Sequence, residues 1–178
     1  MRRKVTCTAA TQTGEVAALL IAQLDLAALV VLGGPQGLAG DVAGAASAQR
    51  YEPRVDGGGW ADAAGADVVV LDVVGEETAR EIAARCGGAV VVVATASPVV
   101  DVERLLEGTH LPRARIVGVP VQDAGPITVA ARATEVVDAV LRDRRRALKV
   151  AVQLHEEDGA RVELREARMG AGGVQAIL

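Results

Sequence analysis

The chain has 178 residues, of which 51% are hydrophobic and only 1% aromatic, and it carries a formal net charge of -4. This length suits one compact domain, with room for a small appendage. Val, Leu, Ile and Ala must build the core, a composition that favours buried parallel strands covered by Ala-rich helices. The negative net charge gives no general attraction to nucleic acids or to anionic membranes, so neither class of partner is expected.

Strand-forming runs alternate with helical patterns along the first two thirds of the chain. We predict strands over residues 4–8, 28–32, near 52–55 (followed by a Gly-rich loop), 66–74, 88–95 and 114–119. We predict helices between them over residues 14–24, 36–48, 76–86 and 99–108. This alternation predicts an α/β fold with a doubly wound, six-stranded parallel sheet.

The pattern changes after Pro126. A long amphipathic helix is predicted over residues 127–146. Period-2 alternation in 148–155 and 161–169, on either side of the turn Glu157-Asp158-Gly159, predicts an antiparallel hairpin. We therefore divide the chain into a Rossmann-like domain, residues 1–125, and a helix-plus-hairpin segment, residues 126–178.

The cysteines and the start of the chain bear on location. Cys7 falls on an apolar strand and Cys86 at a helix end, which predicts buried thiols in a reducing compartment rather than a disulfide. The basic residues 2–4 resemble the start of a signal peptide, but residues 11–15 interrupt the apolar run that should follow. No apolar run is long enough to span a bilayer as a helix. We expect a soluble, cytoplasmic protein.

Several separate segments, in the correct order along the whole chain, resemble the lactate/malate dehydrogenase family. They are RKVTCTAATQTGEVA, PQGLAGDVAGAA, DGGGWADAAGADVVVL, VVVVATASPVVDV, LPRARIVGV, ATEVVDAVLRDRRRALKVAVQL and MGAGGVQAIL. The resemblance implies a shortened, malate-dehydrogenase-like chain with a Rossmann-type NAD-binding fold. It also implies that residues 126–178 are a remnant of the catalytic domain.

The resemblance places the family's glycine-rich turn, G-x-G-x-x-G, over TAATQTG between the first predicted strand and helix. Ala9 and Thr11 replace the first two glycines, and their Cβ atoms intrude where backbone should approach a pyrophosphate. Gly14 matches the third glycine, which serves mainly helix–strand packing. Gly33-Gly34-Pro35 replaces the acid that would bind the adenosine ribose. A dismantled NAD site is expected; the candidate cofactor contacts that remain are Thr11, Gln12, Gly14 and Ser97, the last in place of an asparagine.

Most of the family's catalytic residues have no counterpart. The arginine-bearing loop should follow the fourth strand, but the sequence runs directly into a helix whose Arg80 and Arg85 we interpret as surface charges. Asp123 matches the acid that orients the catalytic histidine; it is either a relic of catalysis or a turn or helix-capping residue. Pro126 stands where the substrate-binding arginine belongs.

The histidine-bearing segment is absent, and neither His110 nor His155 matches a catalytic position. No Cys/His spacing indicates a metal site, and there is no P-loop or nucleophile elbow. The basic run 142–146 is interpreted as cations that complement a helix C-terminus rather than as a phosphate site.

A subunit interface is expected over the helix 36–48. Gly40 and Gly44 lie one turn apart on one face, where small residues permit close approach of another helix. In the dehydrogenase family the equivalent helix lies in the subunit interface. The resemblance therefore implies a homodimer, or a complex with a related full-length dehydrogenase, across Gln36, Gly37, Gly40, Asp41 and Gly44. The alternative is that an Ala/Gly-biased segment drifted to small residues.

Two functional hypotheses follow. In the first, the chain is a dehydrogenase-like protein that has lost its catalytic and most cofactor-binding residues, binds no cofactor, and acts non-catalytically through self-association or protein partners. In the second, it is an NAD-dependent oxidoreductase that works through an altered site. We favour the first, because no residue supplies the proton donor and the fixed substrate carboxylate that reduction of a 2-oxo acid requires.

Overall fold

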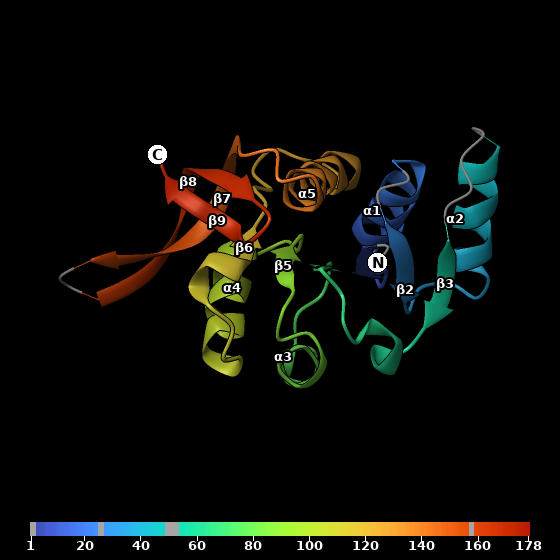
Figure 1. The fold of residues 1–178 in the computed structure, drawn as a ribbon, viewed down its shortest axis with the longest axis horizontal. Helices are drawn as coiled ribbons and strands as arrows, with labels where there is room; N and C mark the ends of the chain where they lie inside the picture. The colour runs from blue at the N-terminus through green and yellow to red at the C-terminus, as the bar shows by residue number, and fades with distance from the viewer. Residues whose placement is uncertain (1–2, 25–26, 49–53, 157–158) are drawn as a thin grey trace.

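One nine-stranded sheet with helices on both faces forms the protein (Figure 1). The structure, a computed structural model, describes residues 3–24, 27–48, 54–156 and 159–178. The strands are ordered β3-β2-β1-β4-β5-β6-β7-β8-β9, and β1 to β6 run parallel. The order of these six is that of a doubly wound dinucleotide-binding sheet. The predicted α/β fold with a six-stranded Rossmann-type sheet is confirmed.

The parallel strands are short, and helices connect most of them. The strands are β1 (Lys4–Thr8), β2 (Ala28–Leu32), β3 (Val55–Gly58), β4 (Val68–Leu71), β5 (Val90–Val93) and β6 (Ile116–Gly118). The helices are α1 (Gln12–Gln23), α2 (Leu38–Ser47), α3 (Glu76–Arg85), α4 (Pro98–Gly108) and α5 (Pro126–Leu141), with short 3-10 helices η1 (Trp60–Ala63) and η2 (Arg113–Arg115). The antiparallel strands β7 (Arg146–Glu156), β8 (Gly159–Gly170) and β9 (Gly173–Ile177) follow α5.

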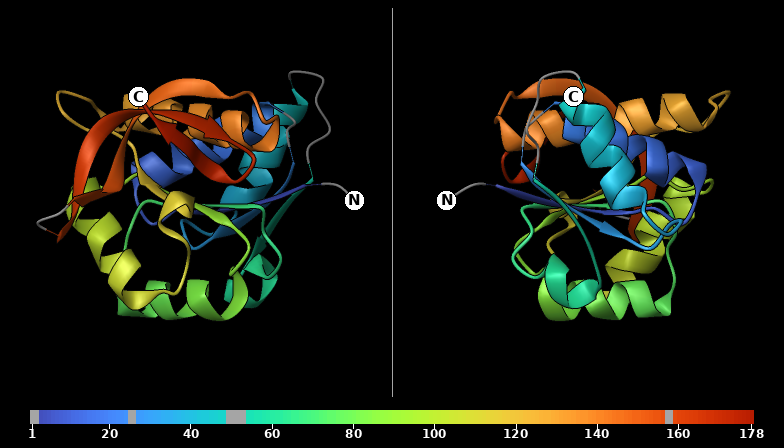
Figure 2. Two further views of the ribbon diagram at one scale, coloured as in Figure 1. Left: turned by 60° about the vertical axis from the view of Figure 1, so that its left-hand side comes forward. Right: turned by 90° about the vertical axis from the view of Figure 1, so that its right-hand side faces the viewer.

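Alternating side chains of the strands form a core on each face of the sheet. Val5 and Cys7 of β1 pack into one cluster with α1, α2 and α5. Val69 and Leu71 of β4 pack into the other cluster, with α3 and α4. Figure 2 shows these two helical layers on opposite sides of the sheet. All of β4 is buried, as expected for a central strand of a parallel sheet that is covered on both faces.

The predicted C-terminal hairpin is confirmed as β7 and β8, and β9 extends it by a third strand. The hairpin continues the main sheet, because β7 pairs antiparallel with β6 at Gly118 and Ala151. The predicted turn residues Glu157 and Asp158 lie outside the described residues. Helix α5 packs on α1, and both contribute to the same hydrophobic cluster. The division into residues 1–125 and 126–178 stays a prediction.

The helix predicted over 127–146 is wrong at its C-terminal end, because α5 ends at Leu141. Asp143 and Arg145 take positive φ values of 47° and 53°, which break the helical path. The Asp143 carboxylate accepts hydrogen bonds from the Ala171 backbone N–H (3.0 Å) and from Nε2 of Gln175 (3.2 Å). These bonds, led by that of Ala171, lower the pKa of Asp143. The turn is therefore held by the β8–β9 connection, 28 residues further along the chain.

The third strand differs from its predicted position. It was expected near 52–55 with a Gly-rich loop after it, but β3 begins at Val55 and runs through Gly57 and Gly58, which pair with β2. Residues 49–53 lie outside the described part of the chain. A Cβ on Gly57 would lie 3.4 Å from the Ala39 side chain of α2. This is a van der Waals contact distance, so Gly57 lies next to α2 at the edge of the sheet.

Thr6 of β1 gives a test of this core. Its side chain is fully buried, and its hydroxyl is the one buried side-chain polar atom among the described residues without a hydrogen-bond partner. Replacing it in Thr6→Val removes an unsatisfied hydroxyl at constant shape. We expect the free energy of unfolding to rise by about 1 kcal/mol and Tm by about 2–4 °C.

The matched control is Thr134→Val in α5, where the buried hydroxyl donates a 2.8 Å hydrogen bond to the Ala130 carbonyl. Loss of this bond should lower Tm. Thermal denaturation followed by circular dichroism measures both variants. A Tm for Thr6→Val at or below that of the wild type would contradict the conclusion that the Thr6 hydroxyl has no hydrogen-bond partner among the described residues.

Candidate functional site

The carboxyl ends of β1, β4, β5 and β6 meet at one edge of the sheet, where α1 leaves toward one face and α3 toward the other. Ligands of doubly wound folds bind at such a switch point. A cavity of about 420 Å³ lies there. Its polar lining consists of Thr11, Thr13, Thr95 and Asp72, and the rest is alanine, valine and proline. No Lys, Arg or His is among the described residues that line it.

The Asp72 carboxylate organises the polar end of this cavity. Its Oδ2 atom accepts hydrogen bonds from the Thr11 backbone N–H (2.6 Å) and the Thr11 hydroxyl (2.8 Å). Its Oδ1 atom accepts one from the Thr8 hydroxyl (2.6 Å), which in turn accepts the Asp72 backbone N–H (3.0 Å). Asp72 is only 5% exposed. One side chain from the end of β4 therefore joins the end of β1 to the start of α1.

The backbone of the turn TAATQTG has conformations that alanine and threonine adopt without strain. Ala9 is buried, and its N–H donates to the Leu32 carbonyl at 2.9 Å, which prolongs the β1–β2 ladder. Thr11 is the N-cap residue of α1 with extended backbone, φ -130° and ψ 166°. Ala9, Ala10 and Thr11 are not among the described residues with positive φ. The turn therefore does not need the conformational freedom of glycine at these positions.

Gly14 has a packing role in this structure. A Cβ there would lie against the Thr8 carbonyl oxygen and 2.5 Å from the Asp72 Oδ2 atom. The missing side chain lets α1 approach β1 and the carboxylate, which matches the helix–strand packing role expected for the third glycine.

Two other predicted cofactor contacts, Gln12 and Ser97, are not among the residues that line the cavity. Gln12 is exposed at the first position of α1. Ser97 is the exposed N-cap residue of α4, without a side-chain capping bond. The neighbouring Thr95 does line the cavity, and its hydroxyl donates at 2.6 Å to Asp101, which also pairs with Arg104 (2.8 Å). The structure thus brings Thr11 to the cavity together with three polar residues that were not among the predicted contacts, Thr13, Asp72 and Thr95.

Asp123 lies exposed in the turn before α5, with a positive φ of 55°. The N-cap of that helix is Gly125, so the helix-capping interpretation is wrong. Aspartate tolerates the left-handed conformation better than most residues, which agrees with the turn interpretation.

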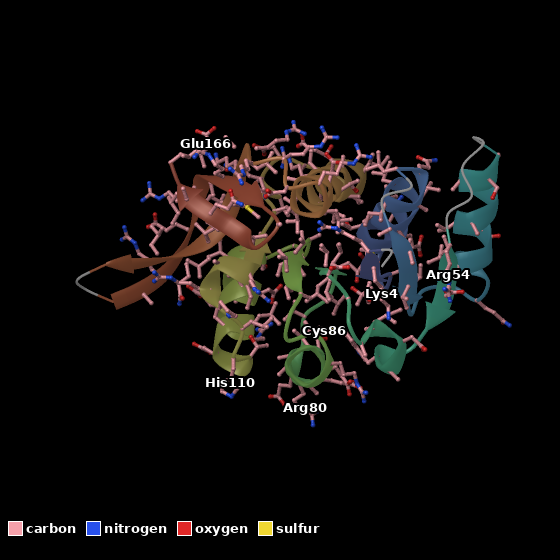
Figure 3. The ribbon with its side chains drawn as sticks, viewed as in Figure 1. Lys4, Arg54, Arg80, Cys86, His110 and Glu166 are labelled. Atoms are coloured by element: carbon pink, nitrogen blue, oxygen red, sulfur yellow. The ribbon has the colours of Figure 1, made fainter. Side chains whose placement is uncertain are left out.

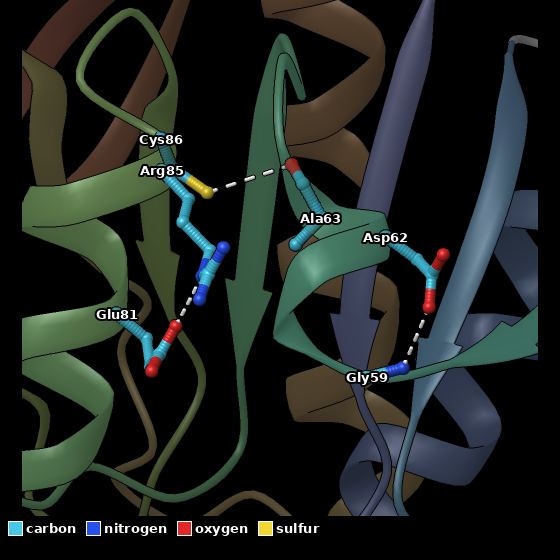
Figure 4. A network of polar contacts seen from close by, with 6 residues as sticks. All are labelled: Gly59, Asp62, Ala63, Glu81, Arg85 and Cys86. Atoms are coloured by element: carbon cyan, nitrogen blue, oxygen red, sulfur yellow. Dashed lines mark hydrogen bonds and ion pairs between the residues drawn. The ribbon is translucent and has the colours of Figure 1, made fainter.

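Three of the remaining candidate residues, Arg80, Arg85 and His110, are exposed. Figure 3 shows Arg80 and His110 pointing away from the sheet beyond α3 and α4, and both are exposed. Figure 4 shows Arg85 paired with Glu81, one helical turn away, at 2.5 Å. The backbone of His155 lies near the end of β7.

The basic run after α5 is paired within the chain. Arg142 and Arg144 both contact the Asp138 carboxylate, at 3.2 and 2.6 Å, and Arg146 contacts Glu135 at 2.8 Å. These pairs support the structural interpretation of the run over a phosphate site.

Both cysteines are buried free thiols, as predicted. Burial raises the pKa of Cys7, and the nearby Asp72 charge raises it further. Burial likewise raises the pKa of Cys86, whose S–H donates to the Ala63 carbonyl at 3.6 Å (Figure 4). Since the thiolate is the nucleophile, neither thiol is suited to catalysis at neutral pH. No group of His, Cys, Asp and Glu suited to a metal ion occurs among the described residues.

The expected interface helix α2 presents an open face. The expected interface positions Gln36, Gly37, Gly40, Asp41 and Gly44 are all exposed. A Cβ on Gly40 or Gly44 would meet no atom within 4 Å. Neither glycine is therefore needed for packing within the described part of this chain.

Solved structures of lactate and malate dehydrogenases resemble this one over its whole length. The lactate dehydrogenase of Cryptosporidium parvum, complexed with lactic acid and nicotinamide adenine dinucleotide, has a TM-score of 0.89 at 16% identity; the match covers 100% of this chain and 90% of that chain. The malate dehydrogenase of Aeropyrum pernix has a TM-score of 0.86 at 18% identity, covering 98% and 89%. The chain has the lactate/malate dehydrogenase fold.

These structures share the fold of this chain, and the predicted resemblance is confirmed for the fold. The malate dehydrogenase of Picrophilus torridus, in its apo form, has a TM-score of 0.89 at only 13% identity, covering 100% and 90%. No family model and no curated protein sequence matches the chain. No helix of the described residues is long and apolar enough to cross a membrane.

The packing role of Gly14 can be tested by Gly14→Ala. The added methyl group must displace backbone or the buried Asp72 carboxylate, so we expect the free energy of unfolding to fall by about 1–3 kcal/mol. Gly87→Ala is the control, because it adds the same methyl group in open space, away from α2, at a position without positive φ, and should raise stability by about 0.4–1 kcal/mol. Urea denaturation of both variants measures the difference; equal effects would contradict the role of Gly14.

Proposed function

We propose that this chain is a dehydrogenase-fold protein that performs no hydride transfer and acts through self-association or protein partners. One observation carries the proposal: the cavity at the carboxyl edge offers one carboxylate and no cation or imidazole. Reduction of a 2-oxo acid needs a proton donor and a cation that fixes the substrate carboxylate. The threonine hydroxyls of the lining supply neither, and the Asp72 charge repels an anionic substrate.

The start of α1 supports the same proposal. A dinucleotide pyrophosphate binds free N–H groups at this helix terminus. Here the Thr11 N–H already donates to Asp72. We propose that the protein binds no NAD and needs no cofactor, and that Asp123 is a turn residue. The buried free thiols support a reducing compartment, and we propose the cytoplasm.

The proposal predicts little or no binding of NADH to the purified protein. Losing two contacts to charged groups, each worth about 1.5–3 kcal/mol, weakens binding by several orders of magnitude. Calorimetric titration is the measurement, and a micromolar dissociation constant would contradict the proposal.

The double variant Ala9→Gly/Thr11→Gly serves as the companion experiment. It restores both glycines but supplies no histidine or arginine, so turnover of malate or lactate should stay absent. Measurable turnover would refute the assignment of lost catalytic residues.

The alternative candidate function is that of an NAD-dependent oxidoreductase that works through an altered site. The cavity of about 420 Å³ at the switch point favours it, because such crevices hold ligands in folds of this kind. The same NADH titration separates the two functions.

For the partner surface we propose a homodimer, or a complex with a related dehydrogenase, across residues 36–48. The exposed glycines of α2 support it, since a second helix can approach their backbone closely. Between α1 and α2 runs a groove of about 280 Å³ that Val16, Leu19 and Leu38 help to line.

The interface proposal predicts that Gly40→Leu/Gly44→Leu converts the assembly into monomers while the circular dichroism spectrum is unchanged. Both leucines project into open space within the monomer, so the fold should tolerate them. Ala83→Leu/Ala84→Leu on α3 is the control, because these exposed positions lie on the other face of the sheet. Light scattering measures the mass. A monomeric wild type that co-purifies with no partner would remove the proposal.

A further inference from the structure

The Asp72 carboxylate is a buried charge with no cationic partner among the residues that the structure describes. Its two oxygens accept hydrogen bonds from the hydroxyls of Thr8 and Thr11 and from the Thr11 N–H. No ion pair to Asp72 occurs among the described residues. A buried carboxylate is costly unless hydrogen bonds and positive potential stabilise it. At this position the stabilising potential comes from the N-terminus of α1.

A helix N-terminus offers free N–H groups and a partial positive charge, and it stabilises an anion placed against them. Helix α1 has 12 residues, and Asp72 Oδ2 lies 2.6 Å from the N–H of its N-cap residue, Thr11. The carboxylate comes from β4, the strand beside β1. The carboxylate therefore lies against the helix terminus at which a doubly wound fold binds a ligand phosphate.

The local packing is arranged around this carboxylate. Gly14, in the first turn of α1, leaves the space that Oδ2 occupies, because a Cβ would lie 2.5 Å from that atom. On the other side Thr8 holds Oδ1 with its hydroxyl and also accepts the Asp72 N–H. The anion at α1 is thus fixed by residues from β1, α1 and β4. The cavity of about 420 Å³ opens beside it.

We propose that the Asp72 carboxylate is an internal substitute for a ligand phosphate, and that its charge makes the adjoining cavity reject phosphate-bearing molecules. This inference rests on the proposed function, in which the α1 terminus binds no nucleotide, and it names the residue that sets this specificity. Removal of the one carboxylate should free the Thr11 N–H and open the terminus of α1 to a phosphate.

The test uses Asp72→Ser, which vacates the position, and Asp72→Asn, which keeps the shape and removes the charge. Glu76→Ser is the matched control: it removes one charge from the first turn of α3, where Glu76 is exposed. Each ¹⁵N-labelled protein is titrated with ADP and with inorganic pyrophosphate. The readouts are the dissociation constant and the NMR shifts of the backbone amides of Thr11, Gln12 and Thr13.

We expect Asp72→Ser to bind ADP at least tenfold more tightly than the wild type, with shifts centred on these three amides. Asp72→Asn should gain less affinity for ADP, because its side-chain amide still fills the place of the carboxylate. Glu76→Ser should match the wild type. Since Asp72→Asn retains hydrogen-bonding groups toward Thr8 and Thr11, it decides the test if Asp72→Ser does not fold.

Three results overturn the inference: no gain in ADP affinity in whichever of Asp72→Ser and Asp72→Asn folds, an equal gain in Glu76→Ser, or wild-type amides that already shift with ADP. Its failure is distinguishable from failure of the proposed function. Wild-type protein that binds NADH while the α1 amides stay unmoved contradicts the proposed function alone. Variants that gain nothing while the wild type binds no NADH contradict only the inference.

Discussion

The bond network of Asp72 is the constraint on which the carboxyl edge of the sheet depends. It joins Thr8 at the end of β1 to Thr11 at the start of α1, so the first crossover is fixed to the central strand of the sheet. Three hydrogen-bond donors and the positive potential of the helix N-terminus act on the same carboxylate. Together they stabilise its negative charge in this buried position. The close approach of Gly14 follows from the same arrangement.

The remainder of the fold supplies a rigid frame for that network. The sheet is continuous from β3 to β9, and hydrophobic clusters on both faces bury nearly every strand residue of β4 and β5. Because these strands consist of valine and leucine, close packing depends on small helix residues, such as Ala17 and Ala18 of α1, which are fully buried. Among the described residues, no aromatic side chain is one of the buried members of either cluster.

The sequence predicted the fold well where the signal is local. Strands 4–8 and 28–32 were placed at their observed bounds, because an apolar run ends at a change of composition on each side. The end of α5 was missed, because Asp143 breaks the helix through bonds to residues 28 and 32 positions away. The role of Asp72 was missed for the same reason: its partners Thr8 and Thr11 lie 64 and 61 residues earlier. An acid directly after a Val-rich strand beside β1 was the signal available.

The position of the carboxylate also bears on where the chain can interact. In a dinucleotide-binding fold the energy of the α1 terminus is used to hold a ligand, and it is available only when that ligand is bound. In this chain the Asp72 carboxylate accepts the Thr11 N–H at that terminus, and this hydrogen bond contributes to the folded state. Under the proposed function, contacts with other molecules come from surfaces that the fold leaves open. The exposed face of α2 is such a surface. A Cβ on Gly40 or Gly44 would contact no other atom of the described chain, whereas a Cβ on Gly14 would collide with Thr8 and Asp72.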